Sequence, residues 1–480
     1  MPDFDGAMSA SMLNSFLHEK GFKTDVIIHD KFPKAHGLTD SEVMNYLTSI
    51  EPSLLIIPDA GTSDVKQCKI LSELGWGIII LDHHEKVEAN GDNKYAIVIN
   101  NQMNDDVENK YGSGTLVTWH FLHAWDSRLA KKYTTYVAVS LLSDSMNLCS
   151  DENGTFIHWG FKENAIHKNL KPIIDKFQKD YLPMSFSFGG IIPKGNATIR
   201  MGSLEDKKYL IDTLSGFGEY CDEKECIKRM TKCYNLQTKE ANRLMEESVE
   251  IDDLDENILL CKLSEKSPCT GLVANKLMSK YSKPILLLHE DEDSNLCAGS
   301  VRSPMEIKDL LERCENIEYA QGHSQALGTA YKKENEQAVK DYLYSLTLPE
   351  PHIEVLTSYS KNLPPTDLID EFGVYTDLWA SNSNVITQPR YAFTDIKLSE
   401  NKVEVIGRGG TTIKFRIGAW TFVKFFCSHK WIEDNIKGDM LIDIIGTLQW
   451  NEWQGNKTPQ VIIDEIIFKE QKDEFEALFG

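Results

Sequence analysis

The chain has 480 residues, of which 41% are hydrophobic and 26% are charged, a composition typical of a soluble protein long enough for several domains. Its 51 Lys and Arg residues against 73 Asp and Glu residues give a net charge of −22, which argues against a protein that coats nucleic acid through bulk positive charge. A nuclease is still compatible with this charge, because bound divalent metals can reverse the field of an acidic cleft.

Targeting signals and cysteine spacing indicate the compartment. The N-terminal sequence MPDFDGAMSA has no basic region followed by a long apolar core, so we predict no signal peptide. No run of about 18 apolar residues predicts a transmembrane helix. The ten cysteines are irregularly spaced without a CxxC pair, which favours reduced thiols over a zinc cluster at Cys221, Cys226 and Cys233. We therefore expect a cytoplasmic protein.

Residues 1–160 alternate between short apolar runs and helical stretches, a pattern that predicts a mostly parallel sheet. The runs VIIHD, LLIIPDAG, GIIILDHH and YAIVINN lack period-two alternation, as strands buried on both faces do. The carboxyl ends of parallel strands lie at one edge of a sheet, where ligands bind. Three of the four runs end in titratable side chains at this edge: Asp30, Asp59 and the triplet Asp82-His83-His84.

The rest of the chain divides into four further segments. Residues 161–252 read as a helical connector that ends in one long helix, and residues 253–350 read as a second, smaller α/β unit. A linker over 351–386 precedes residues 387–480, where five strand-like runs with little helix predict an OB-like β-barrel. The expected fold class is therefore α/β: a parallel-sheet domain, a long helical connector, a smaller α/β domain and a C-terminal OB-like β-barrel.

Dispersed carboxylates and histidines are the strongest chemical signal in the first segment. They are Asp3 and Asp5 in DFDG, Asp59, the triplet Asp82-His83-His84, and Asp144 in an apolar helix. A buried aspartate in such a helix is costly unless it has a partner. Alone, each motif has an ordinary structural explanation as a surface turn, a capped loop or a hydrogen-bonded carboxylate. Together they indicate a site for two oxygen-preferring divalent ions, which suits phosphoryl chemistry.

These motifs carry a family resemblance. DFDG, PDAG, DHH and SDS resemble the four motifs of the DHH phosphoesterase superfamily. Further segments are similar to the RecJ family of single-strand-specific exonucleases within it: IIPKGNATIRMG, AGSVRS, AQGHSQALG and TLQWNEWQGNKTPQVIIDEI. The resemblance implies a DHH domain over 1–160, a DHH-associated substrate domain over 253–350 and an OB-like nucleic-acid-binding domain over 387–480.

The resemblance also implies residue roles. The implied metal ligands are Asp3, Asp5, Asp59, His84 and Asp144, with Asp59 as the bridge. His83 would contact the scissile phosphate or a metal, and Asp82 would orient the two histidines, so that Asp82, His83 and His84 form the catalytic group. The implied phosphate-binding residues of the substrate domain are Arg302, Ser303, Gly322 and His323, and those of the nucleic-acid channel are Asn196 and Arg200.

The activity that follows is hydrolysis of single-stranded DNA from its 5′ end by a two-metal in-line attack. Manganese is the expected cofactor, with two ions bound and magnesium as the alternative, because mixed carboxylate and histidine ligation suits it. A monomer is expected, with single-strand-binding protein or a helicase as candidate partners. Two alternatives stay open: a DHH phosphodiesterase for nanoRNA or cyclic dinucleotides, and a catalytically silent scaffold of replication or recombination.

Three departures from the family pattern bear on these expectations. The family has a strand before its first motif, whereas this sequence starts at Met1-Pro2-Asp3, so we expect either that the true start lies upstream or that the first metal site is weakened. Ile199 occupies the position of a usual glycine before Arg200, and Gln321 replaces the first glycine of the Gly-Gly-His pattern. These two changes would alter the shape of the substrate site without touching the metals.

Overall fold

The computed structural model describes residues 3–28, 37–39, 41–87, 90–103, 106–187, 189–247, 249–291, 294–348, 354–360, 362–373, 389–407, 410–425, 427–453 and 456–469. The chain divides into two compact units, Met1–Pro349 and Glu350–Gly480. The finer division into five segments stays a prediction. None of the helices that the structure describes has both the length and the apolar character needed to cross a bilayer.

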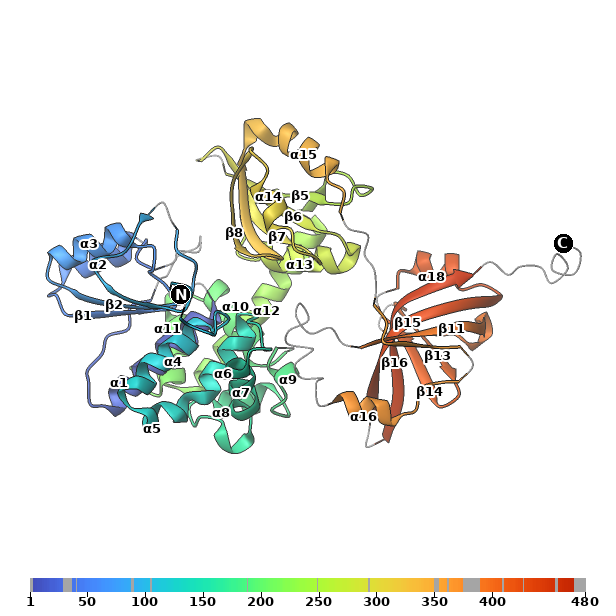
Figure 1. The fold of residues 1–480 in the computed structure, drawn as a ribbon, viewed down its shortest axis with the longest axis horizontal. Helices are drawn as coiled ribbons and strands as arrows, with labels where there is room; N and C mark the ends of the chain where they lie inside the picture. Colours follow the sequence, from blue (N-terminus) through green and yellow to red (C-terminus); the bar gives the residue numbers. More distant parts are fainter. Residues whose placement is uncertain are drawn as a thin grey trace, which may run out of the picture. The chain divides into compact units, whose positions relative to one another are not determined.

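The first sheet positions the candidate site. It contains three parallel strands in sequence order: β1 (Leu54–Pro58), β2 (Gly77–Asp82) and β3 (Ile97–Asn100). Two helices, α1 (Phe4–Glu19) and α4 (Gly114–Trp125), lie on one face, and α2 (Ser41–Ser49) and α3 (Val65–Glu73) lie on the other (Figure 1). The sheet is parallel, as the alternating pattern predicts, so the carboxyl ends of β1 and β2 meet at one edge.

One predicted strand is not found. Residues 26–28 of the run VIIHD are not part of a strand, and Asp30 lies outside the described residues. In the described part of the chain no other strand pairs with the free edge of β1. A short run with three apolar residues cannot form a strand without a neighbour to accept its ladder hydrogen bonds, so the apolar character of the run was an insufficient criterion.

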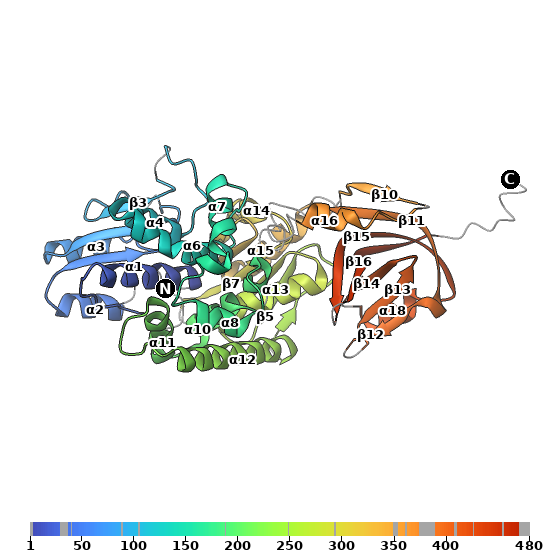
Figure 2. The ribbon, with the colours of Figure 1, turned by 90° about the horizontal axis from the view of Figure 1, so that it is seen from below.

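Helices pack beneath this sheet and lead to the second one. They are α5 (Ser127–Ala130), α6 (Thr134–Ser143), α7 (Asp151–Gly160), α8 (Lys171–Phe177), α9 (Pro183–Ser187), α10 (Ile191–Met201), α11 (Leu204–Ser215) and α12 (Glu223–Glu247). The long helix expected near the end of the connector is α12, which packs on α10 and α11 (Figure 2). Helix α1 contacts α4, α6 and α11 and is buried on nearly all sides.

The second sheet of the first unit has six strands in the order β4-β5-β6-β7-β9-β8. Its strands are β4 (Val249–Ile251), β5 (Leu259–Leu263), β6 (Ile285–Asp291), β7 (Leu296–Arg302), β8 (Ile317–His323) and β9 (Ala326–Lys332). Its helices are α13 (Thr270–Tyr281), α14 (Lys308–Glu312) and α15 (Glu336–Ser345). Strands β5 and β6 are parallel, whereas β6, β7, β9 and β8 pair antiparallel. This mixed sheet matches the expected smaller α/β unit.

The C-terminal unit is built around seven strands in the order β10-β11-β15-β16-β14-β13-β12. The elements are β10 (Thr357–Tyr359), α16 (Asp367–Gly373), β11 (Arg390–Ser399), β12 (Glu404–Ile406), β13 (Thr412–Ile417), β14 (Trp420–Lys424), α18 (His429–Asn435), β15 (Asp439–Trp453) and β16 (Asn456–Lys469). Strands β10 and β12 are the two edges of this sheet. Among the described strands they do not pair with each other, so the sheet is not closed into a barrel. Strand β11 is absent from the five predicted runs because its register shifts between Phe393 and Ile396, which interrupts the alternation.

A buried histidine links α6 to the connector. The His167 ring stacks on Tyr133, with ring centroids 4.9 Å apart. Its Nδ1 accepts a hydrogen bond from the backbone N–H of Asn169 at 3.3 Å and faces the Tyr136 hydroxyl at 3.5 Å. Burial, and then the charge of Lys168, lowers the pKa of His167 to about 4. The folded protein therefore holds this imidazole neutral through mildly acidic pH.

We expect His167 to make the protein less stable as the pH falls from about 6.5 to 4. In that window the unfolded chain binds a proton that the folded chain excludes, so the contribution present above pH 6.5 is lost at lower pH. Between these limits the loss should be about 3 kcal/mol in free energy of unfolding relative to His167→Gln. Urea unfolding of both proteins from pH 8 to 4 measures this, and parallel stability curves would contradict the prediction.

Candidate metal centre

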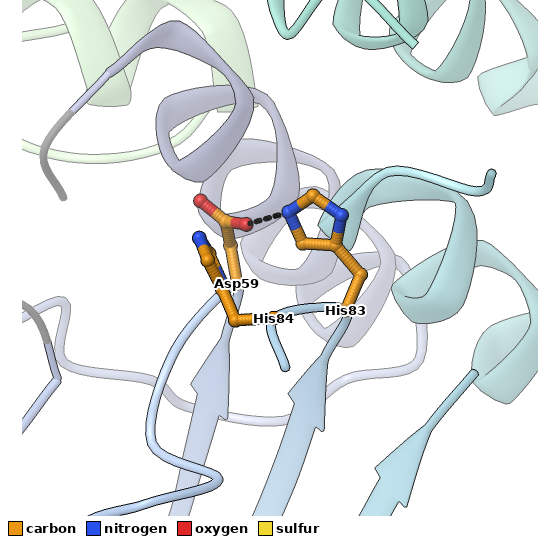
Figure 3. A group of neighbouring side chains, drawn as sticks. All are labelled: Asp59, His83 and His84. Atoms are coloured by element: carbon orange, nitrogen blue, oxygen red, sulfur yellow. Dashed lines mark ion pairs between the residues drawn. The ribbon is translucent and has the colours of Figure 1, made fainter. Parts of the chain in front are cut away.

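The loops that follow β1 and β2 carry the first site residues. Asp82 is the last residue of β2. Asp59 comes directly after β1, and His83 and His84 follow β2 (Figure 3). The backbone of Asp59 has φ +60°, a left-handed conformation that is uncommon for residues other than glycine, and its N–H donates to Leu81 O at 2.7 Å. Strain of this kind is retained where the surrounding structure over-determines it, and it is concentrated at functional sites.

Two helices bring three further carboxylates to the same edge. Helix α1 begins after Asp3, which caps it by accepting the Gly6 N–H at 3.3 Å, and Asp5 lies in its first turn. Asp144 is the C-cap of α6. The chain therefore places carboxylates from α1, β1 and α6 around the histidines that end β2.

His83 lies at the centre of this arrangement. Its Nε2 is 3.3 Å from Asp59 Oδ1, 3.5 Å from Asp144 Oδ2 and 3.8 Å from Asp5 Oδ2. Distances of this size separate neighbouring ligands of one cation when each ligand atom lies about 2–2.2 Å from it. The sequence analysis named His84 as a metal ligand and left His83 to contact the scissile phosphate or a metal. In the structure the His83 side chain is 7% exposed and that of His84 is 43% exposed.

The residues fit divalent metal ions. Two groups of ligand atoms each lie within 4.8 Å of one another: Asp59 with His83 and His84, and Asp5 with His83 and Asp144. Asp59 Oδ1 and Asp144 Oδ2 are buried and, among the described residues, receive no hydrogen bond. A buried acceptor without a donor costs stability unless another positive group meets it. Carboxylate oxygens and imidazole nitrogen are a ligand set that suits manganese and magnesium.

The electrostatics support this fit. Burial, and then the neighbouring charge of Asp5, raises the pKa of Asp59 well above its usual range. Burial also raises the pKa of Asp144 to about 7, with the charges of Asp5 and Asp3 adding to the effect. Burial alone would lower the pKa of His83, but its close contact with Asp59 and the charges of Asp144, Asp59 and Asp5 raise it well above the usual value. Several carboxylates can be ionised together here only beside added positive charge.

Asp82 does not face the cluster but holds the histidine loop. Its Oδ1 accepts from the backbone N–H groups of His83 and His84 and from His84 Nδ1 at 2.7 Å. Its Oδ2 accepts from the backbone and hydroxyl of Thr62. Burial opposes ionisation of Asp82, yet these hydrogen bonds, those of His84 foremost, hold its pKa below the usual range. The hydrogen bond to Asp82 therefore fixes the orientation of the His84 ring.

Residues that the sequence did not single out support the same loops. Asn100, at the end of β3, donates to Thr62 Oγ1 at 2.8 Å and to the backbone carbonyl of His84 at 2.9 Å. The signal for Asn100 was its place at a strand end, as for the polar residues that follow β1 and β2.

Asn196, which the sequence analysis assigned to the nucleic-acid channel, lies next to the start of α1. Its Oδ1 accepts the backbone N–H of Phe4 at 3.2 Å.

The predicted phosphate-binding residues form a second, basic region. Arg302 ends β7, and its Nη1 donates to the carbonyl of Val301 at 2.7 Å. Burial, and then the charge of Arg200, lowers the pKa of Arg302 to about 10. Ser303 is buried next to Arg302. Gly322 has φ +131°, and His323, whose side chain is outside the described set, ends β8.

Comparisons with known proteins bear on the family. The DHH family, N-terminal domain, matches residues 1–142, and the RecJ OB domain matches residues 385–465. A Bacillus subtilis protein named, as a provisional assignment, SPbeta prophage-derived single-strand DNA-specific exonuclease YorK is 27% identical over 97% of this chain and 86% of its own length. Single-stranded-DNA-specific exonuclease RecJ of Bacillus subtilis is 23% identical over 98% of this chain and 60% of its own length.

A solved structure has the same fold. The crystal structure of RecJ from Thermus thermophilus in complex with Mn²⁺ superposes with a TM-score of 0.74 at 18% identity, covering 98% of this chain and 68% of that one. The expected resemblance and the α/β fold class with a C-terminal OB domain are therefore confirmed, although the described OB strands do not close into a barrel.

Proposed function

Because this chain combines a DHH-family N-terminal domain with a RecJ-type OB domain, we propose that it is a metal-dependent exonuclease of single-stranded DNA. The observation that carries the proposal is the cluster in which His83 Nε2 lies within 3.8 Å of Asp5, Asp59 and Asp144. Curated relatives that align with nearly the whole chain carry the name of single-strand DNA-specific exonucleases. We therefore assign single-stranded DNA as the substrate of this site and exonucleolytic hydrolysis as its reaction.

Two divalent ions would be held by the residues of the cluster. Asp5 and Asp144 lie in one group of candidate ligands, and His84 and Asp59 lie in the other. His83 belongs to both groups, and its Nε2 would bind one of the two ions. Asp3 contributes charge from the start of α1. Manganese is the preferred ion and magnesium the alternative. When bound, such ions polarise a phosphoryl group and lower the pKa of water.

The chain's own residues would orient and neutralise the substrate. Asp82 would fix the tautomer of His84 through the hydrogen bond at Nδ1, while His83 is buried among the carboxylates. Arg302 and Arg200 bind phosphate oxygens, because guanidinium groups form bidentate pairs with them. Water would attack phosphorus in line and release a proton to solvent as the new P–O bond forms. The bond to the departing sugar oxygen breaks, and that oxygen takes up a proton from solvent. Release of one mononucleotide at a time from the 5′ end follows.

The context of the activity is part of the same proposal. We assign the protein to the cytoplasm as a monomer that acts on single strands exposed by a helicase or coated by single-strand-binding protein.

The test compares three substrates with Mn²⁺ present: a 5′-labelled single-stranded thirty-mer, the same sequence as a duplex, and a dinucleotide. We expect degradation of the single strand to mononucleotides from the 5′ end, with the duplex resistant. Cleavage of the dinucleotide alone would instead favour a small-substrate phosphodiesterase. Calorimetric Mn²⁺ binding without any hydrolysis would favour a catalytically silent scaffold.

A further inference from the structure

Asp5 is surrounded by hydroxyl groups that the proposed reaction does not use. Four fully buried hydroxyl residues gather around it: Ser9, Ser113, Thr115 and Ser140. They come from α1, from the N-terminus of α4 and from α6, far apart in the sequence. Buried hydroxyls are costly unless each finds a hydrogen-bond partner, so a cluster of four around one carboxylate needs an explanation.

The inner pair donates directly to the carboxylate. Asp5 Oδ1 accepts from the Thr115 hydroxyl at 2.5 Å, the Thr115 backbone N–H at 3.0 Å and the Ser140 hydroxyl at 2.6 Å. Asp5 Oδ2 accepts only from the Gly114 backbone N–H at 2.8 Å among the described residues. Oδ1 is therefore fully engaged, and Oδ2 keeps free lone-pair capacity.

The outer pair fixes the direction of these bonds. Ser9 lies 2.9 Å from the Thr115 hydroxyl, and Ser113 lies 2.5 Å from the Ser140 hydroxyl. A hydroxyl has one hydrogen to donate. Since Thr115 and Ser140 give theirs to Asp5, the outer serines must be the donors in both contacts. The four hydroxyls thus form two short chains that end on Oδ1.

Resting on the metal role proposed for Asp5, we propose that Thr115 and Ser140 are positioning residues that hold Asp5 to bind the metal through Oδ2 alone. Oδ2 is the oxygen that lies 3.8 Å from His83 Nε2. The other two carboxylates differ, because Asp59 and Asp144 each present a buried oxygen without a hydrogen bond among the described residues. Asp5 is therefore oriented before the metal binds. For the oxygens of Asp59 and Asp144 that have no hydrogen bond among the described residues, the cation itself would be the partner.

Helix α6 connects the hydroxyl groups that hold Asp5, which we call the clamp, to the metal ligands. Ser140 and Asp144 are four residues apart, so they lie on the same side of the helix end, and the Asp144 N–H donates to Ser140 O at 3.0 Å. One helix therefore carries both a group that orients a ligand and a ligand itself. Partners that orient metal ligands usually contribute 10–100-fold in metal affinity.

The experiment is calorimetric titration of the full-length protein with Mn²⁺. Thr115→Val and Ser140→Ala should each weaken Mn²⁺ affinity by about 10–100-fold, and Thr115→Ser should restore it to within about threefold. The matched control is Thr118→Val, one turn along α4, because the Thr118 hydroxyl is buried without a hydrogen bond among the described residues. Its Mn²⁺ affinity should be unchanged.

A second readout separates positioning from folding. The Mn²⁺ concentration for half-maximal DNA hydrolysis should rise by the same factor in Thr115→Val and Ser140→Ala, while the rate at saturating Mn²⁺ stays within about threefold. A crystal structure with Mn²⁺ should show Oδ2 of Asp5, and not Oδ1, as the ligand atom. Circular dichroism and thermal unfolding of the metal-free variants check that each is folded. If Thr115→Val is not folded, Ser140→Ala, the smaller change, tests the positioning role alone.

Unchanged Mn²⁺ affinity in the folded variants, or an equal loss in Thr118→Val, would overturn the proposal. Ligation by Oδ1 would overturn it as well. If the wild-type protein binds Mn²⁺ but hydrolyses no DNA, the proposed function fails while the clamp is still decided by calorimetry.

Discussion

Asp144→Ala should lower the rate of single-stranded DNA hydrolysis by about 10³-fold and leave DNA affinity within about threefold of the wild type. Asp144 Oδ2 is a buried oxygen 3.5 Å from His83 Nε2 and has no hydrogen bond in the described structure. Its loss removes a metal ligand, and several kcal/mol of transition-state stabilisation correspond to this factor. The basic residues that would bind the strand, Arg302 and Arg200, are untouched. Single-turnover hydrolysis and fluorescence anisotropy of a labelled thirty-mer measure the two quantities.

The stability of the same variant is a useful companion measurement. Without metal, the wild-type protein buries several carboxylates together, so removal of one should leave the free energy of unfolding equal to or above that of the wild type. Asp151→Ala, which removes an exposed aspartate from the first turn of α7, is the matched control and should hydrolyse DNA at the wild-type rate. A folded Asp144→Ala protein that loses binding and hydrolysis equally would contradict the metal role.

Strand ends and helix starts made much of the site predictable. Asp59 and the Asp82-His83-His84 triplet follow apolar runs that form parallel strands, and parallel strands bring their carboxyl ends together. The aspartate at the end of an apolar helix, Asp144, also had a physical signal, because burial of an unpaired carboxylate is costly. The long helix α12 followed from composition and period alone.

The different exposure of the His83 and His84 side chains was not predictable from the sequence. Both follow the same strand, and only the turn after β2 decides that the His83 side chain is buried and that of His84 is exposed. That turn is held by Asp82, Thr62 and Asn100 through hydrogen bonds between separate strands. No local pattern encodes such contacts.

The sequence analysis did not predict the hydroxyl cluster around Asp5, for a related reason. Its members belong to three helices, and serine and threonine are common at caps and surfaces, where they need no special explanation. Ser113 does carry a local signal, since it caps α4. The strand β11 was missed because of its bulge, and the strand expected over VIIHD was wrong for residues 26–28, which have no described strand beside them.

Gly114→Ala should disrupt the same centre from outside the motifs that carry the carboxylates. A Cβ at this position would lie 2.7 Å from Asp59 Cβ and 2.8 Å from Asp59 Cγ, and closer still to Asp59 Oδ1. Asp59 cannot easily yield, because its left-handed backbone is tied to β2 through Leu81. We expect a loss of about 1–3 kcal/mol in free energy of unfolding from overpacking. Misplacement of Asp59 by about 1 Å should reduce DNA hydrolysis by about 10²-fold.

Gly154→Ala provides the contrast that makes this prediction specific to the site. Gly154 lies inside α7, and the nearest atom to an added Cβ is the Leu148 carbonyl oxygen at 3.5 Å, an ordinary contact. Alanine there should stabilise the protein by about 0.5–1 kcal/mol and leave hydrolysis unchanged. Urea unfolding, Mn²⁺ calorimetry and thirty-mer hydrolysis on both variants provide the comparison. If Gly114→Ala retained the wild-type Mn²⁺ affinity and rate, the N-terminus of α4 would have to be free to move away from Asp59, and the close approach would not be needed for the site.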